Sequence, residues 1–408
     1  STQGGIVIPL DNDTNKFFLV VTGGGIGQYY SRPLNNIFRR TMGARYTLID
    51  KTNPNLVVLP DTNMIIAPPV GGGDADDGTI LSAEYITAIP RCGGGHWLIL
   101  IDDGGGSTDK KLLVYKVDST GITYHSTCNK VLENSYSGQM KASPNGNFIA
   151  CPGYIFRFNN STGTATFMKE YGVFDPLLYS DYYGVSFSPN SEILYVTLID
   201  STISTRLVQY DLLSSNDSLS KQLIRIPETF AYFNSLQLAP DNRIYLSNDG
   251  VPQLGVINFP NNLNSPSNPN NCGFTLDGPM LQNSNGEGGS CRAGLPNMID
   301  ALSPGSFALG FTHVDSNCRT VKFYPNKFCD SVAIWRFGDG DSSTNQFPIH
   351  TYATNDSFTV RMVMRNGDSA VKRIRIGIDN PIIQGDTFVS CNASQIFVYT
   401  ISNQNNSY

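Results

Sequence analysis

The sequence predicts an all-β protein, with a β-propeller of about six or seven blades followed by an immunoglobulin-like β-sandwich. Three observations lead to this fold class. Only 15% of the residues are Asp, Glu, Lys or Arg, against an average of about 25%, and these residues normally fill the exposed faces of helices. The 22 Phe, 20 Tyr, 39 Gly and 23 Pro residues suit short strands joined by turns. Finally, a turn-and-strand pattern repeats between residues 142 and 246.

The repeat is a Pro-Asn or Pro-Asp turn followed by a run of apolar and aromatic residues. Its prolines, Pro144, Pro189 and Pro240, are 45 and 51 residues apart. Proline presets φ for such a turn, and the run after it suits an inner strand. Alternating apolar and polar segments, typical of half-exposed strands, accompany the repeat. A period of about 45 residues with about four short strands is typical of a propeller blade, although a β-sandwich with coincidental Ser-Pro turns would also fit.

The chain divides into three parts by this pattern. Residues 1–303 form the propeller and include a Pro-, Asn-, Gly- and Ser-rich loop at 260–296. Ser303, Pro304 and Gly305 mark the boundary to the second part. In residues 304–380, alternating strands joined by Gly- and Asn-containing turns indicate the sandwich. Residues 381–408 are too short for a domain, so we expect the start of a further immunoglobulin-like module or a strand that pairs with a partner.

Charge and hydropathy exclude two classes of function. With 28 basic and 34 acidic residues the formal net charge is −6, which argues against nucleic acid as a partner. Purely aliphatic and aromatic runs such as residues 97–101 are far shorter than the ~20 residues that span a bilayer. We therefore expect no membrane span.

Eight cysteines and no CxxC pair argue against zinc ribbons and thioredoxin-like motifs. An even number in a turn-rich chain of low charge predicts disulfides and an oxidising compartment. The sequence leaves their connectivity open. The candidates that close short loops are Cys272 with Cys291 and Cys318 with Cys329.

One motif in the sandwich region identifies a resemblance to the PKD domain family. The family hallmark is Trp-Asp-Phe-Gly-Asp-Gly followed by Pro-x-His-x-Tyr, and Arg336 departs from it at the first Asp. The resemblance implies an immunoglobulin-like fold in which His350 packs or forms hydrogen bonds. The matching residues are Trp335, Phe337, Gly338, Asp339, Gly340, Pro348, His350 and Tyr352.

The first 303 residues resemble the propeller of YVTN or WD40 type that precedes PKD modules in large surface proteins of Bacteroidota, the type IX-secreted and gliding-motility-associated group. This resemblance implies a secreted cell-surface protein, with further sequence before Ser1 and after Tyr408. The segments that carry it are residues 6–9, 46–50, 141–145, 183–189, 236–240, 254–257 and 294–297.

Asp-Ser dipeptides followed by Thr or an aliphatic residue match the pattern that Bacteroidota O-glycosylate on exported proteins. The same dipeptide is also ordinary turn chemistry, so both interpretations stay open. The candidate acceptors are Ser119, Ser201, Ser218 and Ser369.

No motif for a cofactor or a catalytic centre is complete. The glycine run at residues 23–27 lacks the last glycine of a dinucleotide fingerprint, and neither HExxH nor GxSxG occurs. Asp74, Asp76 and Asp77 are weak calcium candidates, because the twelfth position of an EF-hand loop would be Tyr85. We therefore predict no catalytic residues and no cofactor, with calcium as the one possible ion.

These observations favour a non-enzymatic extracellular scaffold, adhesin or filament subunit that presents a propeller to proteins or glycans. Residues 382–408 could pair with a sheet edge of another copy or another surface protein. A carbohydrate-active enzyme on the same propeller is the alternative, and it predicts carboxylates or a metal at the central channel. A carbohydrate-binding protein is a third hypothesis and predicts exposed aromatic platforms; Trp97 and Trp335 lie in strand-like runs, so tyrosines would have to serve.

Overall fold

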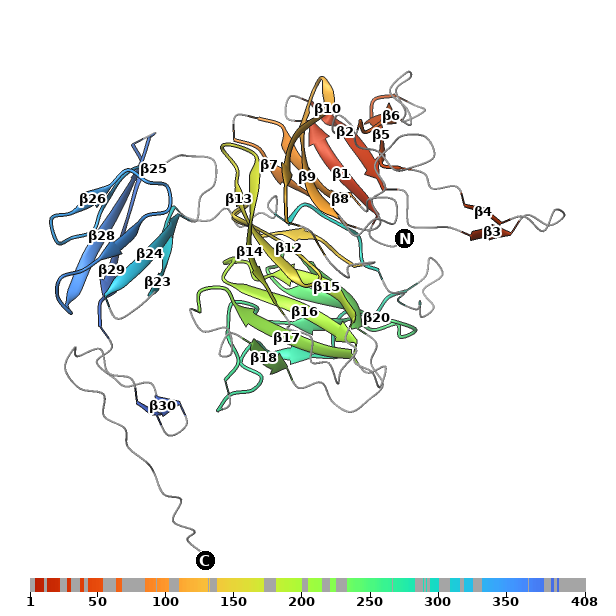
Figure 1. Cartoon of the computed structure of the whole chain (residues 1–408). Helices are drawn as coiled ribbons and strands as arrows, with labels where there is room; N and C mark the ends of the chain where they lie inside the picture. The colour runs from red at the N-terminus through yellow and green to blue at the C-terminus, as the bar shows by residue number, and fades with distance from the viewer. Residues whose placement is uncertain are drawn as a thin grey trace, which may run out of the picture. The chain divides into compact units, whose positions relative to one another are not determined.

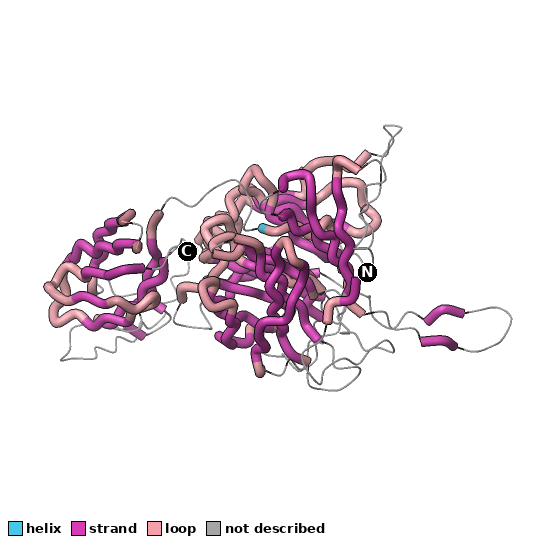
Figure 2. The backbone as a smooth tube through the Cα atoms, turned by 90° about the horizontal axis from the view of Figure 1, so that it is seen from above, coloured by secondary structure: helices cyan, strands magenta, loops and turns pink. Residues whose placement is uncertain are grey.

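The computed structural model shows two compact units, Ser1–Phe307 and Ala308–Tyr408. Nearly all their regular structure is strand (Figure 2). The boundary predicted at residue 303 lies outside the described residues. The structure describes the chain except for residues 1–3, 11–12, 23–27, 31–36, 40–42, 54–63, 68–84, 93, 103–109, 131, 133–137, 172–180, 200–204, 215–220, 225–232, 266, 283–288, 290, 292–293, 301–308, 316–318, 326–331, 366, 378–382, 385–386 and 389–408.

The first unit contains five four-stranded antiparallel sheets, each made of strands that are consecutive or nearly so in the chain (Figure 1). The first two sheets are β1(Gly5–Leu10), β2(Asp13–Val21), β5(Arg45–Asp50) and β6(Met64–Ile65), then β7(Ile86–Pro90), β8(His96–Asp102), β9(Lys111–Asp118) and β10(Gly121–Cys128). The third is β11(Lys141–Ala142), β12(Phe148–Cys151), β13(Tyr154–Asn159) and β14(Thr164–Glu170). The last two are β15(Asp181–Phe187), β16(Ile193–Ile199), β17(Thr205–Asp211) and β18(Lys221–Ile224), then β19(Phe233–Leu238), β20(Ile244–Asn248), β21(Gly255–Ile257) and β22(Phe274–Thr275).

The first strands of neighbouring sheets lie next to each other, as the innermost strands of propeller blades do. Contacts join β1 to β7, β7 to β11, β11 to β15 and β15 to β19. Apolar clusters fill the space between each sheet and the next. The predicted propeller architecture is therefore confirmed.

The sequence predicts about six or seven blades for this unit. Five four-stranded sheets occur among the described residues of this unit. Two long stretches of the unit are only partly described, so the full number of blades stays a prediction. The stretch before β7 contains the first sheet and a separate hairpin of β3(Gln28–Tyr30) with β4(Ile37–Arg39), and the stretch after β21 contains β22 as its one named strand in the described part.

The repeated turns have the geometry that the sequence predicts. Ser143 Oγ accepts the backbone N–H of Phe148 at 2.9 Å, and Ser188 Oγ accepts that of Ile193 at the same distance. In the second copy Ser191 adopts a φ of 64°, the left-handed conformation that such a turn requires. The hydroxyl thus closes the turn and aligns the strand that follows it.

The second unit is a two-sheet sandwich. Its core holds Trp335, Phe323 and Phe337, all of them buried. This arrangement confirms the predicted immunoglobulin-like domain. One sheet has the order β23(Phe311–Asp315), β24(Thr320–Pro325), β27(Ile349–Thr351), and the other has the order β26(Ser342–Ser343), β25(Val332–Arg336), β28(Ser357–Met364), β29(Ser369–Arg375).

The segment after the sandwich is described only at two short strands. β30(Ile383–Gln384) pairs with β31(Thr387–Phe388) in a hairpin. The rest of residues 381–408 lies outside the described residues, so pairing of this segment with a partner stays a prediction.

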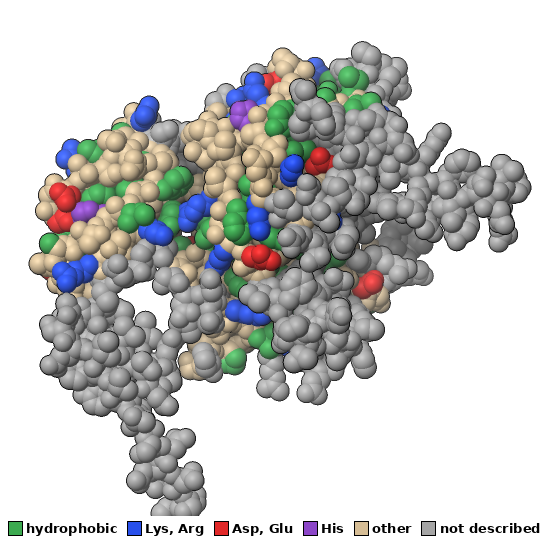
Figure 3. Space-filling model, in the orientation of Figure 1, with side chains coloured by type: hydrophobic (Ala, Val, Ile, Leu, Met, Phe, Trp, Pro, Cys, Tyr) green, Lys and Arg blue, Asp and Glu red, His purple; other side chains and the backbone are tan. Residues whose placement is uncertain are grey.

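The surface agrees with the low charge of the sequence. On the face drawn in Figure 3, neutral side chains and backbone make up most of the coloured surface. None of the residues that the structure describes forms a helix long and apolar enough to cross a membrane.

Candidate binding sites

A network of buried polar side chains connects the inner strands of the propeller. Lys141 on β11 donates from Nζ to Oε1 of Gln237 on β19 at 2.6 Å and to Oδ1 of Asn297 at 3.1 Å. Its Nζ is 3.8 Å from Oδ1 of Asp300, which also accepts a 2.7 Å hydrogen bond from Gln237. Asn297 in turn donates to the carbonyl of Ile86 on β7. The network therefore joins the second, third and fifth sheets to residues 297–300.

Burial changes the acid–base properties of this network. Loss of water lowers the pKa of Lys141, although Asp300 acts in the opposite direction. Loss of water likewise raises the pKa of Asp300, against the effects of Lys141 and Gln237. In both residues burial outweighs the neighbours and disfavours the charged form, so each group depends on its partner inside the protein.

A second polar side chain ties three sheets together. Gln139 accepts the backbone N–H of Val185 at 3.3 Å and that of Leu236 at 2.7 Å through Oε1, and it donates to the carbonyl of Leu236 at 3.0 Å. Sequence reasoning missed Gln139, Gln237 and Asp300. A polar residue within an otherwise apolar inner strand was the available signal, but it identifies no partner.

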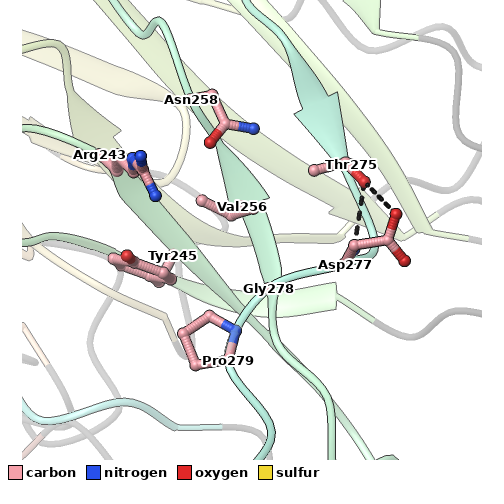
Figure 4. A pocket seen from close by; sticks show the side chains of 8 residues that line it. All are labelled: Arg243, Tyr245, Val256, Asn258, Thr275, Asp277, Gly278 and Pro279. Carbon is pink, nitrogen blue, oxygen red and sulfur yellow. Dashed lines mark hydrogen bonds between the residues drawn. The ribbon is translucent and has the colours of Figure 1, made fainter.

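An open pocket lies on the fifth sheet, with a volume of about 340 Å³ (Figure 4). Tyr245, Val256 and Thr275 form its floor, because they are in register on β20, β21 and β22. Figure 4 shows Arg243 and Tyr245 on one side of the cavity, with Thr275 and Asp277 on the other. Asn258, Gly278 and Pro279 complete the lining.

The pocket combines a guanidinium, a carboxylate and an aromatic ring. Tyr245 donates its hydroxyl to Oδ2 of Asp241 at 2.7 Å, which fixes the ring. Partial burial, together with this hydrogen bond to Asp241, raises the pKa of Tyr245. Thr275 donates to Asp277 at 3.1 Å, which leaves the other carboxylate oxygen of Asp277 available. Such a set can bind hydroxyl groups of a ligand and stack against its apolar face.

The PKD motif residues come together in one hydrogen-bonded stack. His350 Nε2 is 2.6 Å from Oδ2 of Asp339, and its ring stacks on Phe337 at 4.1 Å between centroids. Tyr352 donates to the carbonyl of Phe337 at 3.1 Å. Arg336 is exposed, so a side chain other than the family's Asp fits there without entering the core.

The Asp339 carboxyl is held in its charged form. Partial burial acts to raise its pKa, but hydrogen bonds from His350 and from the N–H of Asp341 outweigh burial and lower it.

The glycine between Phe337 and Asp339 is required by geometry. Gly338 has a φ of 90°, and a Cβ there would lie 2.7 Å from the carbonyl oxygen of Thr359.

Two groups of carboxylates bear on the calcium prediction. Asp74, Asp76 and Asp77 lie outside the described residues. In the sandwich, Asp339, Asp341 and His350 place ligand atoms within 4.8 Å of one another and could hold a cation. The same positions of Asp339 and His350 also suit a structural hydrogen bond without a cation, because Nε2 of His350 already bonds to Asp339.

The disulfide predicted between Cys272 and Cys291 is not formed. Cys272 is a fully buried free thiol in the core between the fourth and fifth sheets. Burial raises its pKa to about 11. Cys291 bonds instead through its backbone to Gly250 and Val251, near the start of β21. Short separation in the chain therefore did not bring the two sulfur atoms together, and the Cys318–Cys329 pair lies outside the described residues.

Two of the four predicted glycosylation acceptors are described, and both are exposed. Ser119 lies in the turn between β9 and β10, beside Asp118, which binds the Thr120 hydroxyl through its carboxylate. Ser369 begins β29 and accepts a hydrogen bond from Arg361 at 3.2 Å. Ser201 and Ser218 lie outside the described residues. Modification of any of them stays a prediction.

Neither tryptophan can serve as an exposed platform for a sugar. Trp97 is 3% exposed and donates its indole N–H to the carbonyl of Asn160, and Trp335 is fully buried. The large aromatic side chains exposed in the described part are Tyr124, Phe167 and Phe259.

The fold and the motif together define a class of protein in which a β-propeller is followed by an immunoglobulin-like PKD domain. Residues 319–375 match the PKD domain family, and a PKD domain is typical of extracellular proteins. No curated protein sequence matches the chain.

The solved structures that match the chain include three that cover at least 80% of it. A Lactobacillus plantarum protein is 10% identical, with 89% of this chain and 82% of that chain covered and a TM-score of 0.40. The periplasmic gluconolactonase of Pseudomonas aeruginosa is 13% identical, with 90% and 85% covered and a TM-score of 0.38. A streptogramin B lyase is 13% identical, with 80% and 91% covered and a TM-score of 0.34. These similarities concern architecture alone.

Proposed function

We propose that this chain is a non-enzymatic extracellular scaffold or adhesin whose propeller binds a glycan through the pocket on the fifth sheet. The observation that carries the proposal is the composition of that pocket. Arg243 and Asp277 can each form two hydrogen bonds with neighbouring hydroxyls, and Tyr245 offers a fixed ring for the apolar face of a sugar. The alternative ligand is a protein loop that offers hydroxyl groups and an apolar face to the pocket.

The buried polar network around Lys141 and Asp300 supports a scaffold rather than a catalytic role for these side chains. Asp300 is hydrogen-bonded to Gln237 and lies beside Lys141, with both charged side chains removed from solvent. A carboxyl group in such a position stabilises the ring. A glycosidase would instead need a pair of carboxyl groups within reach of the glycosidic bond.

The setting of this activity is the cell surface. A PKD domain is typical of extracellular proteins, and the propeller segments resemble those of type IX-secreted surface proteins of Bacteroidota. On this basis the chain belongs to a surface adhesin or appendage, where residues 382–408 pair with a neighbouring subunit as an added strand.

A glycan array probed with the labelled full chain tests the proposal. The variant Arg243→Ser with Asp277→Asn should lose at least about tenfold in affinity, since each lost charged hydrogen bond is worth roughly 1.5–3 kcal/mol. The control variant Lys16→Ser with Asp13→Asn removes an exposed pair of the first sheet and should bind normally. Equal binding by the pocket variant would exclude this site, and release of sugar products from the array would favour the enzyme instead.

A further inference from the structure

The second unit carries an array of arginines on the outer face of the sheet β26–β25–β28–β29. Arg336 on β25 is directly opposite Arg361 on β28, and Arg361 is opposite Val371 on β29. Arg373 lies two residues beyond Val371, so it is on the same face and diagonal to Arg361. The opposite face of the same strands is the buried core. We propose that this array, the arginine face, binds the carboxylates of an acidic polysaccharide.

Folding alone does not account for the arginine face. Like charges directly opposite each other on neighbouring strands destabilise a sheet. The four strands contain no Asp or Glu. The acidic residues nearest in sequence lie beyond the strand ends and are Asp330, Asp339, Asp341, Asp356 and Asp368. Within the described part of the chain, no carboxylate forms an ion pair with Arg336, Arg361 or Arg373. Among the described residues, these three arginines make one polar contact, from Arg361 Nη2 to Ser369 Oγ at 3.2 Å.

The charge of this unit differs in sign from that of the whole chain. Residues 308–408 contain nine Lys or Arg and eight Asp or Glu, a formal charge of +1, whereas the full chain carries a net charge of −6. Arg336, Arg361 and Arg373 are all exposed. An anionic ligand is therefore attracted by the local positive charge of this face, although the net charge of the chain is negative.

The spacing and the neighbouring residues favour a polysaccharide. Adjacent strands are about 4.8 Å apart and alternate residues about 6.7 Å apart, so the guanidinium groups form a flat, regular array. Each can bind a carboxylate through two parallel hydrogen bonds. Ser357, Thr359 and Ser369 share this face and offer hydroxyl partners for a sugar chain. The face has no aromatic side chain on which bases could stack, as a single-stranded nucleic acid would need.

Binding of the full chain to polygalacturonate tests this inference, with its methyl ester as the uncharged counterpart. The variant Arg336→Ser, Arg361→Thr, Arg373→Thr should bind at least tenfold more weakly. The slope of log affinity against log salt should also become shallower by about two to three, because fewer counterions are released on binding. The control Lys51→Ser, Lys130→Ser, Lys221→Ser removes the same charge from the first unit and should bind as the wild type does.

Three results would overturn the inference. They are an equal loss of affinity in the control variant, undiminished binding to the methyl ester, and equally tight binding to single-stranded DNA or to vesicles of anionic lipid. Arg361→Lys provides a check that does not depend on net charge, since lysine cannot form two parallel bonds. It should bind more weakly than the wild type with an unchanged unfolding temperature. The variants that remove the pocket on the fifth sheet should keep full affinity, so the two proposals fail separately.

Discussion

Lys141 and Asp300 form a buried pair at the inner strands of the propeller, with Nζ and Oδ1 3.8 Å apart and their side chains 0% and 1% exposed. The two residues are 159 positions apart in the chain. Their contact, with those to Gln237 and Asn297, holds the segment after the fifth sheet against the second and third sheets. The pair thus stabilises the inner ring from within.

Replacing Lys141 by Met should destabilise the propeller by about 3–5 kcal/mol, because it leaves the Asp300 charge buried without its partner. Urea unfolding followed by fluorescence measures the loss. The double variant Lys141→Met with Asp300→Leu should recover much of it, since two apolar groups restore a neutral interior. A double variant as unstable as the single one would mean that lost packing, and not the unpaired charge, causes the effect.

The hydrogen-bonded carboxyl of Asp339 predicts a dependence of sandwich stability on pH. The folded pKa of Asp339 lies below its usual value of 3.8, so this carboxyl stabilises the fold above about pH 4. That contribution is lost as the pH falls through the lower folded value. In Asp339→Asn, stability at pH 7 should fall by about 1 kcal/mol, a figure reduced for solvent screening.

Thermal unfolding at pH 7 and pH 3 checks this dependence. The wild type should lose more stability than Asp339→Asn between these two values, because the variant has no charge to neutralise at that position. Equal losses in both proteins would assign the acid sensitivity to other carboxylates.

Gly338→Ala should destabilise the PKD domain by about 2–4 kcal/mol. Its φ of 90° disfavours any side chain, and the new Cβ would meet the Thr359 carbonyl oxygen at 2.7 Å. Gly340→Ala is the matched control, since Gly340 has a φ of 106° but open space around it. It should show only the conformational cost, about 1 kcal/mol. Similar losses in the two variants would remove the close approach as the reason for glycine.

Cys272 should react very slowly with thiol reagents at pH 8 while the protein is folded. Its pKa of about 11 leaves roughly one thiol in a thousand ionised at that pH, and burial blocks access to the rest. Denaturation should make it react at the rate of an ordinary thiol. Peptide mapping provides the decisive control, because a Cys272–Cys291 cross-link in the native protein would contradict the free thiol.

Local motifs were the features that the sequence predicted best. The turns of the repeat form where its prolines predict them, with the Ser143 and Ser188 hydroxyls as an added closure. The PKD motif brings His350 to Phe337. These predictions succeed because each feature depends on residues close in sequence or on a motif with one geometry. Five four-stranded sheets lie among the described residues of the first unit, against the six or seven blades that the repeat predicts.

The sequence by itself determined an all-β chain, the class of each unit and the hydrogen-bonded turns between strands, because strand propensity and turn chemistry act over a few residues. The tertiary structure alone decided that Lys141 meets Asp300, that Arg336 stands opposite Arg361 and that Cys272 stays away from Cys291. Those relationships depend on strand register and on the packing of sheets around an axis, which place residues together irrespective of their separation in the chain.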